Sequence, residues 1–83
     1  MKIILFPNGK HVLLLFICPK TSLHKAEHQI TEYCINHDII PPLNLKKYAS
    51  GYYAWIKFKS LYEAITFCHE NKIKSRISTE ILE

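Results

Sequence analysis

The chain has 83 residues, of which 48% are hydrophobic and 22% are charged, and its formal net charge is +4 at pH 7. This composition excludes an intrinsically disordered chain, and the length suits one small domain, which we expect to cover residues 1–83. All but one of the 11 basic residues are Lys, the exception being Arg76. The charge favours an anionic partner. The excess of Lys favours phosphate binding over base reading, because Lys lacks the planar fork with which Arg recognises guanine.

The cysteines and the apolar runs bear on the cellular compartment. Cys18, Cys34 and Cys68 are odd in number, widely spaced and each in an apolar run, so we expect buried free thiols in a reducing compartment. Residues 12–18, behind Lys10, look like the apolar core of a signal peptide. No small-residue cleavage site follows, and cleavage would remove a strand that the domain needs. No segment is long enough to span a membrane, so we expect a cytoplasmic protein without membrane contact.

The first 18 residues predict a β-hairpin. Residues 2–6 are a short run that is apolar after Lys2, and Asn8-Gly9 follows it, which is a strong hairpin signal because both residue types tolerate positive φ. Residues 2–6 are therefore expected to fold back on residues 11–18. Residues 12–17 are apolar at every position, which is typical of a central strand covered on both faces.

An amphipathic helix is predicted for residues 23–37, after a cap at Thr21 or Ser22. Its apolar positions recur at helical spacing, and residues 36–38 can end it. Residues 39–45 contain Pro41 and Pro42, which forbid a central strand and allow at most an edge strand. Residues 46–50 lead into the next strand.

Residues 51–59 alternate strictly, as a β-strand with two different faces does. Four side chains suited to a core point to one side: Tyr52, Ala54, Ile56 and Phe58. The other side carries Tyr53, Trp55, Lys57 and Lys59. Two aromatic rings beside two lysines suit a surface that stacks planar bases and neutralises phosphates. This strand therefore predicts a surface for single-stranded nucleic acid.

The last third of the chain predicts a helix and a closing strand. Ser60 and Glu63 form a capping-box pattern, in which the Ser side chain accepts from the amide three residues on and the Glu side chain returns the bond. The helix that follows ends near residues 70–72. Residues 73–82 alternate, with Ile77, Thr79 and Ile81 on one side, and are predicted to form the closing strand.

In this order of elements the chain resembles the RNA-recognition motif, a ferredoxin-like β-α-β-β-α-β domain, over residues 12–82. The longer signature of that family, on its third strand, is a basic residue, Gly, an aromatic, Gly or Ala, an aromatic, an aliphatic, any residue and an aromatic. The matching positions here are Tyr53, Ala54, Trp55, Ile56 and Phe58. Gly51 and Tyr52 replace the basic residue and the Gly, so a phosphate contact would fall to Lys46 or Lys47.

The shorter signature of the family lies on its first strand, where Leu15-Phe16-Ile17 fit while Pro19 and Lys20 do not. The resemblance implies that bases stack on Phe16 as well as on the aromatic pair of the later strand. By strand parity it also places Val12 and Leu14 on the open face. Such an apolar patch needs a cover, which would be residues 2–6, a second copy or a partner protein.

The predicted fold is α+β, an antiparallel sheet with two helices packed on one face, in the RRM-like βαββαβ order. An extra N-terminal hairpin strand would compete with the closing strand for the same sheet edge. The predicted function is non-enzymatic binding of single-stranded RNA or DNA. Bases would stack on Phe16, Tyr53 and Trp55, and phosphates would meet Lys46, Lys47, Lys57 and Lys59. The alternative is a protein-interaction module, small regulator or inhibitor that docks through the same face, for instance as a homodimer.

Catalytic and metal sites are not expected. His24 and His28 are four residues apart and Cys34 and His37 are three apart, but the two pairs lie on different helix faces and suit one zinc ion poorly. The two glycines do not make a phosphate-binding loop. No Cys has a suitably placed His and a third orienting group. We therefore expect no catalysis, no cofactor and no metal.

Overall fold

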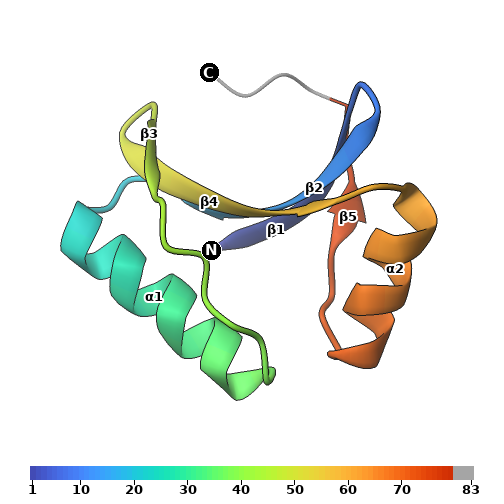
Figure 1. Ribbon diagram of the computed structural model, residues 1–83. Coiled ribbons are helices and arrows are strands. Elements are labelled where there is room, and N and C mark those ends of the chain that lie inside the picture. The colour runs from blue at the N-terminus through green and yellow to red at the C-terminus, as the bar shows by residue number, and fades with distance from the viewer. Residues whose placement is uncertain (80–83) are drawn as a thin grey trace.

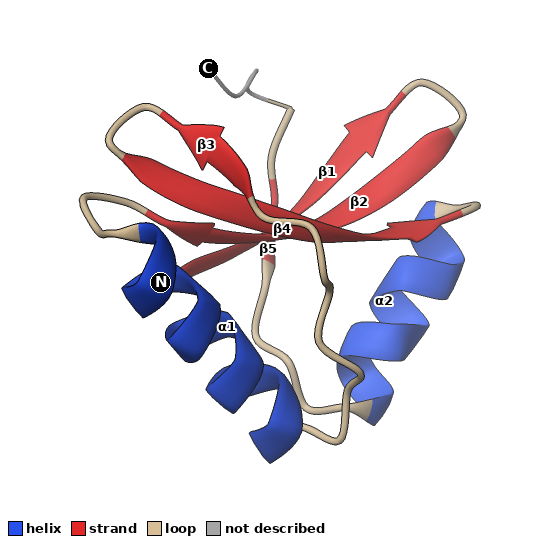
Figure 2. Ribbon diagram, turned by 60° about the vertical axis from the view of Figure 1, so that its left-hand side comes forward, coloured by secondary structure: helices blue, strands red, loops and turns tan. Residues whose placement is uncertain are grey.

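The computed structural model describes residues 1–79 (Figure 1). Within them the chain forms a five-stranded sheet and two helices, in the order β1 (Lys2–Asn8), β2 (His11–Cys18), α1 (Leu23–Asn36), β3 (Lys46–Tyr48), β4 (Gly51–Phe58), α2 (Leu61–Glu70) and β5 (Arg76–Ile77). Both helices lie on the same side of the sheet, as the two ribbon views show (Figures 1 and 2). The α+β class and the two-layer arrangement predicted from the sequence are therefore present.

The strand order across the sheet is β3-β4-β2-β1-β5. The neighbours β3–β4, β4–β2 and β2–β1 are antiparallel, whereas β1 and β5 run parallel. Strand β1 therefore occupies the place beside β2, and the closing strand pairs with the outer edge of β1. The sheet is mixed and not purely antiparallel, which corrects that part of the prediction.

The N-terminal hairpin is present, with a turn one residue later than the sequence predicts. Asn8 pairs with His11, so the two loop residues are Gly9 and Lys10 and not Asn8 and Gly9. Gly9 has a φ of 66°, and a Gly at the first loop position is what a type II′ hairpin turn requires. Asn8 is therefore the last residue of β1 and not a turn residue.

The edge strand β3 lies after the prolines and not among residues 39–45. It is joined to β4 by a two-residue loop, because Tyr48 pairs with Gly51. Ala49, the first residue of this loop, has a φ of 46°, a region that a side chain with a Cβ enters at some cost. Neither Gly nor Asn marks the turn in the sequence, which is why the pattern did not predict this hairpin.

The structure describes residues 73–79 of the predicted closing strand (residues 73–82), and within them the strand is shorter than predicted. It consists of Arg76 and Ile77, which pair with Ile4 and Leu5 of β1. The backbone amide of Ser78 adds a hydrogen bond of 2.9 Å to the carbonyl of Leu5. The predicted position of Ile81 lies outside the described residues.

The two helices begin and end with similar local structures. Ser22 caps α1 and Ser60 caps α2, each accepting a hydrogen bond from the backbone amide three residues on. At the other end, the amide of Ile39 donates to the carbonyl of Cys34, and the amide of Ile73 donates to that of Cys68, both at 2.8 Å. Asp38 and Lys72 have positive φ, so both ends are Schellman motifs.

The C-terminal ends of the helices are also joined directly. The ring Nδ1 of His37 lies 2.8 Å from the carbonyl oxygen of Asn71, and since a carbonyl only accepts, the ring nitrogen donates. The ring of His37 also stacks on Tyr33, with centroids 4.2 Å apart. The loop after α1 then passes between the helices toward β3 (Figure 2). Its residues Ile40 and Leu43 are 89% and 92% exposed.

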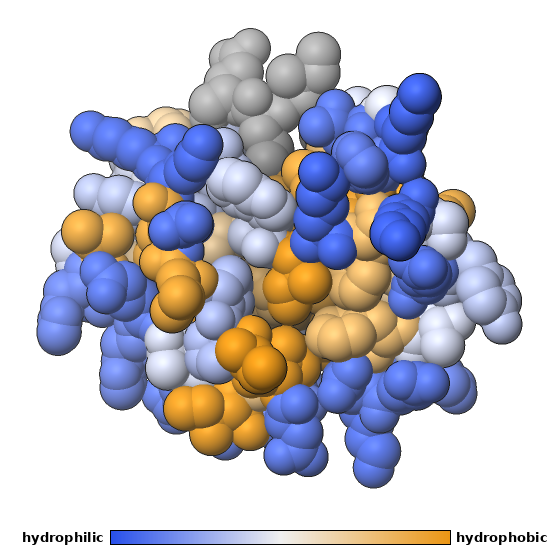
Figure 3. All heavy atoms as spheres, in the orientation of Figure 1, coloured by the Kyte–Doolittle hydropathy of each residue, from blue (hydrophilic) through white to orange (hydrophobic). Residues whose placement is uncertain are grey.

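The main core lies between the sheet and the helices. Strand β2 contributes Val12, Leu14, Phe16 and Cys18, which pack with buried residues of both helices. A space-filling view shows that hydrophobic surface also gathers between the two helices, with hydrophilic residues around it (Figure 3). The core is therefore on the helix side of the sheet, and the opposite side is free of helices.

Candidate nucleic-acid interface

The face of the sheet opposite the helices, here called the open face, is organised in rows that run across the strands. The pairing register places Lys46, Tyr53, Ile17 and Lys2 in one row. The next row contains Trp55, Leu15, Ile4 and Arg76. A third row contains Lys57, Leu13 and Phe6. Because directly paired residues share a face, the register alone determines which side chains can act together here.

An aromatic group lies on the β4 side of this face. The rings of Tyr53 and Trp55 are stacked, with centroids 5.6 Å apart and an interplanar angle of 29°. Tyr48 meets the edge of Tyr53 at 6.2 Å. The ammonium of Lys46 lies 5.2 Å from the centre of the Trp55 ring, within the range of a cation–π interaction. The predicted combination of aromatic rings and lysine is therefore present on one surface.

The centre of the open face is a second, smaller apolar cluster. Its buried members are Ile4, Leu15 and Ile17, with exposed fractions of 6%, 1% and 3%. Around them lie partly buried side chains: Phe6, Leu13, Tyr48, Tyr53 and Trp55. The aromatic rings thus cover the aliphatic centre from one side, and their own faces remain partly exposed. Strand β2 is apolar on both faces because it contributes buried side chains to this cluster and to the main core.

Charge is strongly segregated between the two sides of the sheet. The charged side chains that the register places on the open face are all cationic: Lys2, Lys46, Lys57 and Arg76. Every acidic residue among residues 1–79 lies in a helix or directly after α1: Glu27, Glu32, Asp38, Glu63 and Glu70. An anion that approaches the open face therefore meets positive charge without acidic neighbours in the described sheet.

Phe16 is not part of this surface, which corrects the prediction. It pairs with Ala54 on the helix side, is 0% exposed, and packs against the ring of Tyr33 at 6.1 Å. Leu15 takes the position beside Trp55 instead. The aligned signature misplaced Phe16 because residues 12–18 of β2 are all apolar, so the sequence of the strand does not distinguish its two faces.

Two of the predicted lysines are not among the paired residues of these rows. Lys47 pairs with Tyr52 and therefore points to the opposite side from its neighbour Lys46. Lys59 lies beyond the end of β4, where its backbone amide donates to the carboxylate of Glu63. Of the predicted residues, the structure brings together Tyr53, Trp55, Lys46 and Lys57.

Sequence reasoning missed the contribution of β1 and β5. Lys2 lies opposite Ile17, and Arg76 lies beside Ile4, so both belong to the open face. The period of two along a strand was the signal that could have found Lys2, because it puts Lys2 on the same face as Ile4 and Phe6 once residues 2–6 are taken as a strand. No signal in the sequence indicated that β5 would pair with β1.

The cysteines are buried and free, as predicted. Burial raises the pKa of the Cys34 thiol from 9.0 to about 11, and burial is also the main cause of the raised pKa values of Cys18 and Cys68. These thiols are therefore protonated and weakly nucleophilic at neutral pH. Among residues 1–79 no three metal-binding side chains gather at one point, and His28 instead contacts Glu32 at 3.1 Å.

The remaining findings concern membranes and known proteins. Neither helix of the described part combines the length and the apolar character needed to cross a membrane. Comparison with known proteins finds no family model, no curated protein and no solved structure that matches the chain. The interface is therefore interpreted from its own residues.

Proposed function

We propose that this protein is a non-enzymatic binder of single-stranded nucleic acid in a reducing compartment such as the cytoplasm. Bases stack on Tyr53 and Trp55, and Lys46 and Lys57 neutralise neighbouring phosphates. The observation that carries the proposal is the stacked aromatic pair with Lys46 above it, on a sheet face whose described charges are all cationic. Stacking on such a surface is tolerant of base sequence, because every base has a π-face.

We also propose that the fold is a variant of the ferredoxin-like arrangement found in RNA-recognition motifs. The element order β2-α1-β3-β4-α2-β5 supports this relation, with β1 added between β2 and the closing strand. The position beside Trp55 holds Leu15 where the family signature would put an aromatic ring. The proposed surface therefore has two aromatic rings for stacking on β4 and aliphatic side chains beside them on β2.

The expected energetics follow from stacking and from counterion release. Each stacked base contributes roughly 1–3 kcal/mol. Each neutralised phosphate of a single strand steepens the dependence of log K on log salt by about 0.7. Affinity for a short oligonucleotide is therefore expected to be moderate and to fall clearly between low and physiological salt.

Fluorescence of Trp55 tests the proposal, because it is the only Trp in the chain. Short single-stranded RNA and DNA are titrated at low and moderate salt, and we expect saturable quenching that weakens with salt. Tyr53→Ala is expected to weaken binding by about tenfold or more, since one stacked base is worth roughly 1–3 kcal/mol. Tyr62→Ala is the matched control, because Tyr62 is 79% exposed on α2, on the other side of the sheet.

Adjacent lysines on β3 provide a second matched pair. Lys46 lies over Trp55, whereas Lys47 points to the opposite side. We expect Lys46→Ala to reduce both affinity and salt dependence, and Lys47→Ala to change both much less. Equal losses in the two variants, or no quenching of the wild-type protein at low salt, would contradict the proposed site.

A second candidate function is docking on a protein or on another copy of the chain through the open face. It is favoured by the apolar centre of that face, where Ile4, Leu15 and Ile17 are surrounded by Phe6 and Leu13. An apolar interface of this kind depends little on salt, in contrast to phosphate binding. A dimer mass by light scattering, with blue-shifted Trp55 emission and no response to oligonucleotides, would favour this second function.

A further inference from the structure

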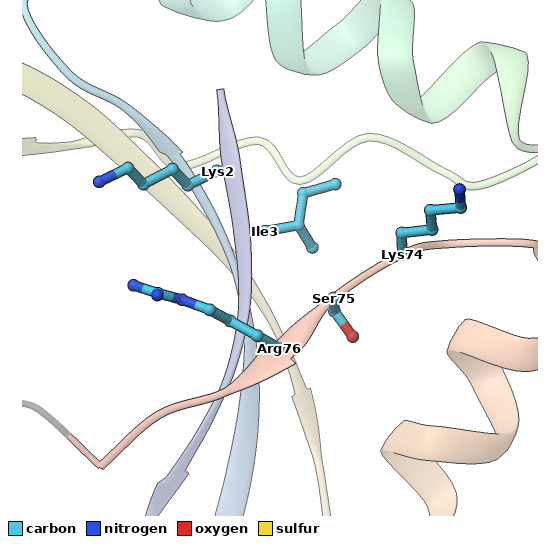
Figure 4. A pocket seen from close by; sticks show the side chains of 5 residues that line it. All are labelled: Lys2, Ile3, Lys74, Ser75 and Arg76. Carbon is cyan, nitrogen blue, oxygen red and sulfur yellow. The ribbon is translucent and has the colours of Figure 1, made fainter.

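A pair of cations lies at the far edge of the open face, away from the aromatic group. Lys2 and Arg76, with Ile3, Lys74 and Ser75, line a cavity of about 400 Å³ where β1 meets β5 (Figure 4). The side chains of Lys2 and Arg76 extend along the same side of β1, whereas those of Ile3 and Lys74 extend along the other (Figure 4). This orientation agrees with the register, in which Arg76 is beside Ile4 and Lys2 is two residues before it.

These two cations lack an acidic partner in the described part of the chain. Between residues 1 and 79 the one ion pair within contact distance joins His28 and Glu32, on α1. Both side chains are exposed, so a ligand in solution can reach both charges. Two neighbouring positive charges with no counter-charge among residues 1–79 favour an anion between or beside them.

The rows of the sheet connect this pair to the aromatic group. Trp55 and Arg76 are the two ends of one row, with Leu15 and Ile4 between them. Three strand spacings of roughly 4.8 Å separate the ends by about 14 Å at the backbone. In the neighbouring row, Ile17 lies between Tyr53 on one side and Lys2 on the other. Each row thus runs from an aromatic ring, over an aliphatic centre, to a cation.

We infer that a single strand of nucleic acid crosses the sheet along these rows, and that Lys2 and Arg76 bind a phosphate beyond the stacked bases. The inference rests on the proposed function. The alternative path along β4 offers Lys57 at one end and Gly51 at the other, so it is cationic at one end alone. The path across the strands has cations at both ends, with Lys46 before Tyr53 and Lys2 or Arg76 after the aliphatic centre.

Two DNA probes separate this subsite from the aromatic group. Thymidine dinucleotide is short enough to occupy the aromatic pair alone, whereas the thymidine octamer reaches the far edge. Both are titrated against Trp55 fluorescence over a range of salt, using wild-type protein and the double variant Lys2→Ala, Arg76→Ala. The side chains removed are exposed, so the variant is expected to keep the circular dichroism spectrum of the wild type.

The double variant is expected to bind the octamer about tenfold more weakly. The slope of log K against log salt should fall by about 1.4, that is about 0.7 for each lost contact. Affinity for the dinucleotide should stay within about twofold of wild type. Arg76→Lys keeps the charge and should keep the salt slope. Lys74 lines the same cavity, but its side chain extends along the other side of β1. Lys74→Ala should therefore change the affinity for the octamer by less than about twofold.

Three results would overturn the inference while leaving the proposed function intact. The first is a double variant that binds the octamer as tightly as the wild type does. The second is an equal loss of affinity for the dinucleotide and the octamer in the double variant. The third is a loss of octamer affinity in Lys74→Ala equal to that in the double variant. If neither probe quenches Trp55 in the wild-type protein at low salt, the proposed function fails and this inference fails with it.

Discussion

The two faces of the sheet are both apolar at their centres, yet they differ in what surrounds the apolar residues. On the helix side, Val12, Leu14 and Phe16 are enclosed by α1 and α2. On the open face, Leu15 and Ile17 are equally buried, but they are covered by aromatic side chains of the sheet itself and edged by cations. The comparison shows that burial of a strand residue does not identify the side on which the helices pack.

The difference between the faces arises from β4 and from the edge strands. Strand β2 offers similar side chains to both faces, whereas β4 offers Ala54 and Ile56 to the helices and Trp55 and Lys57 to the open face. A helix packs closely over small and aliphatic side chains, and a lysine there would lose its hydration. The alternation of β4 therefore distinguishes the two faces, whereas β2 is apolar on both.

Among the substitutions that test this difference between the faces, Phe16→Ala is expected to have the largest effect on stability. Phe16 is fully buried on the helix side, so the substitution should lower the free energy of unfolding by about 3–5 kcal/mol. Urea unfolding measures this loss, and Phe16→Leu provides a milder variant if the first does not fold. A loss below about 1 kcal/mol would indicate that Phe16 is not enclosed by the helices.

A smaller but still large effect is expected from Gly51→Ala, because Gly51 sets the close approach of β4 to the end of β2. An added Cβ would collide with the carbonyl oxygen of Cys18 and would lie 2.7 Å from the Cα of Pro19. Displacing backbone atoms in this way should cost about 1–3 kcal/mol or more. Gly9→Ala is the control, since a Cβ there has no neighbour within 4 Å and meets backbone strain alone. If urea unfolding gives the same loss for both, the collision at Gly51 does not occur.

Alkaline pH should weaken the helix side selectively. The pKa of Cys34 is about 11 in the folded protein against 9.0 for an unburied thiol, so the folded state holds its proton more tightly. This contribution to stability is complete below pH 9 and is lost as the pH rises from 9 to 11, by roughly 1–2 kcal/mol. Urea unfolding at pH 8, 9 and 10 measures the decline. Cys34→Ala should make it shallower, and an unchanged slope would show that Cys34 is not its source.

Lys57→Ala is expected to have the smallest effect on stability. It separates the contribution of the open face to binding from its contribution to the fold. Lys57 is exposed on the open face, so its loss should change the free energy of unfolding by less than about 0.5 kcal/mol. The same variant should reduce the salt slope of oligonucleotide binding by about 0.7. Lys10→Ala, in the hairpin turn, should leave that slope unchanged. A large loss of stability in Lys57→Ala would instead assign this lysine to the fold.

Much of the fold was predictable because its signals are local. The capping serines Ser22 and Ser60 marked both helices, and the alternation of β4 separated its two faces. The error in the predicted position of the hairpin turn did not change which face each side chain occupies. Moving the turn from Asn8-Gly9 to Gly9-Lys10 changes the pairing register by two residues. A shift of two keeps every side chain on the same face.

The remaining features depend on contacts between distant segments. The position of Phe16 depends on its register with Ala54, which a uniformly apolar strand does not reveal. The place of β3 depends on a turn with Ala49 at positive φ, a residue that rarely marks such turns. The phosphate-binding role proposed for Arg76 depends on the pairing of β5 with β1, which is non-local and only two residues long.

The short β5 strand also has a consequence for local opening. A strand held by two paired residues at a sheet edge separates at a much lower free energy than the β2–β4 pair at the centre, so its amides should exchange with solvent earliest within the sheet. A ligand that contacts both Lys2 and Arg76 binds the closed form and excludes the open one. Binding should therefore slow amide exchange at Arg76 and Ile77 in proportion to ligand occupancy, so the weakest strand becomes a reporter of the bound state.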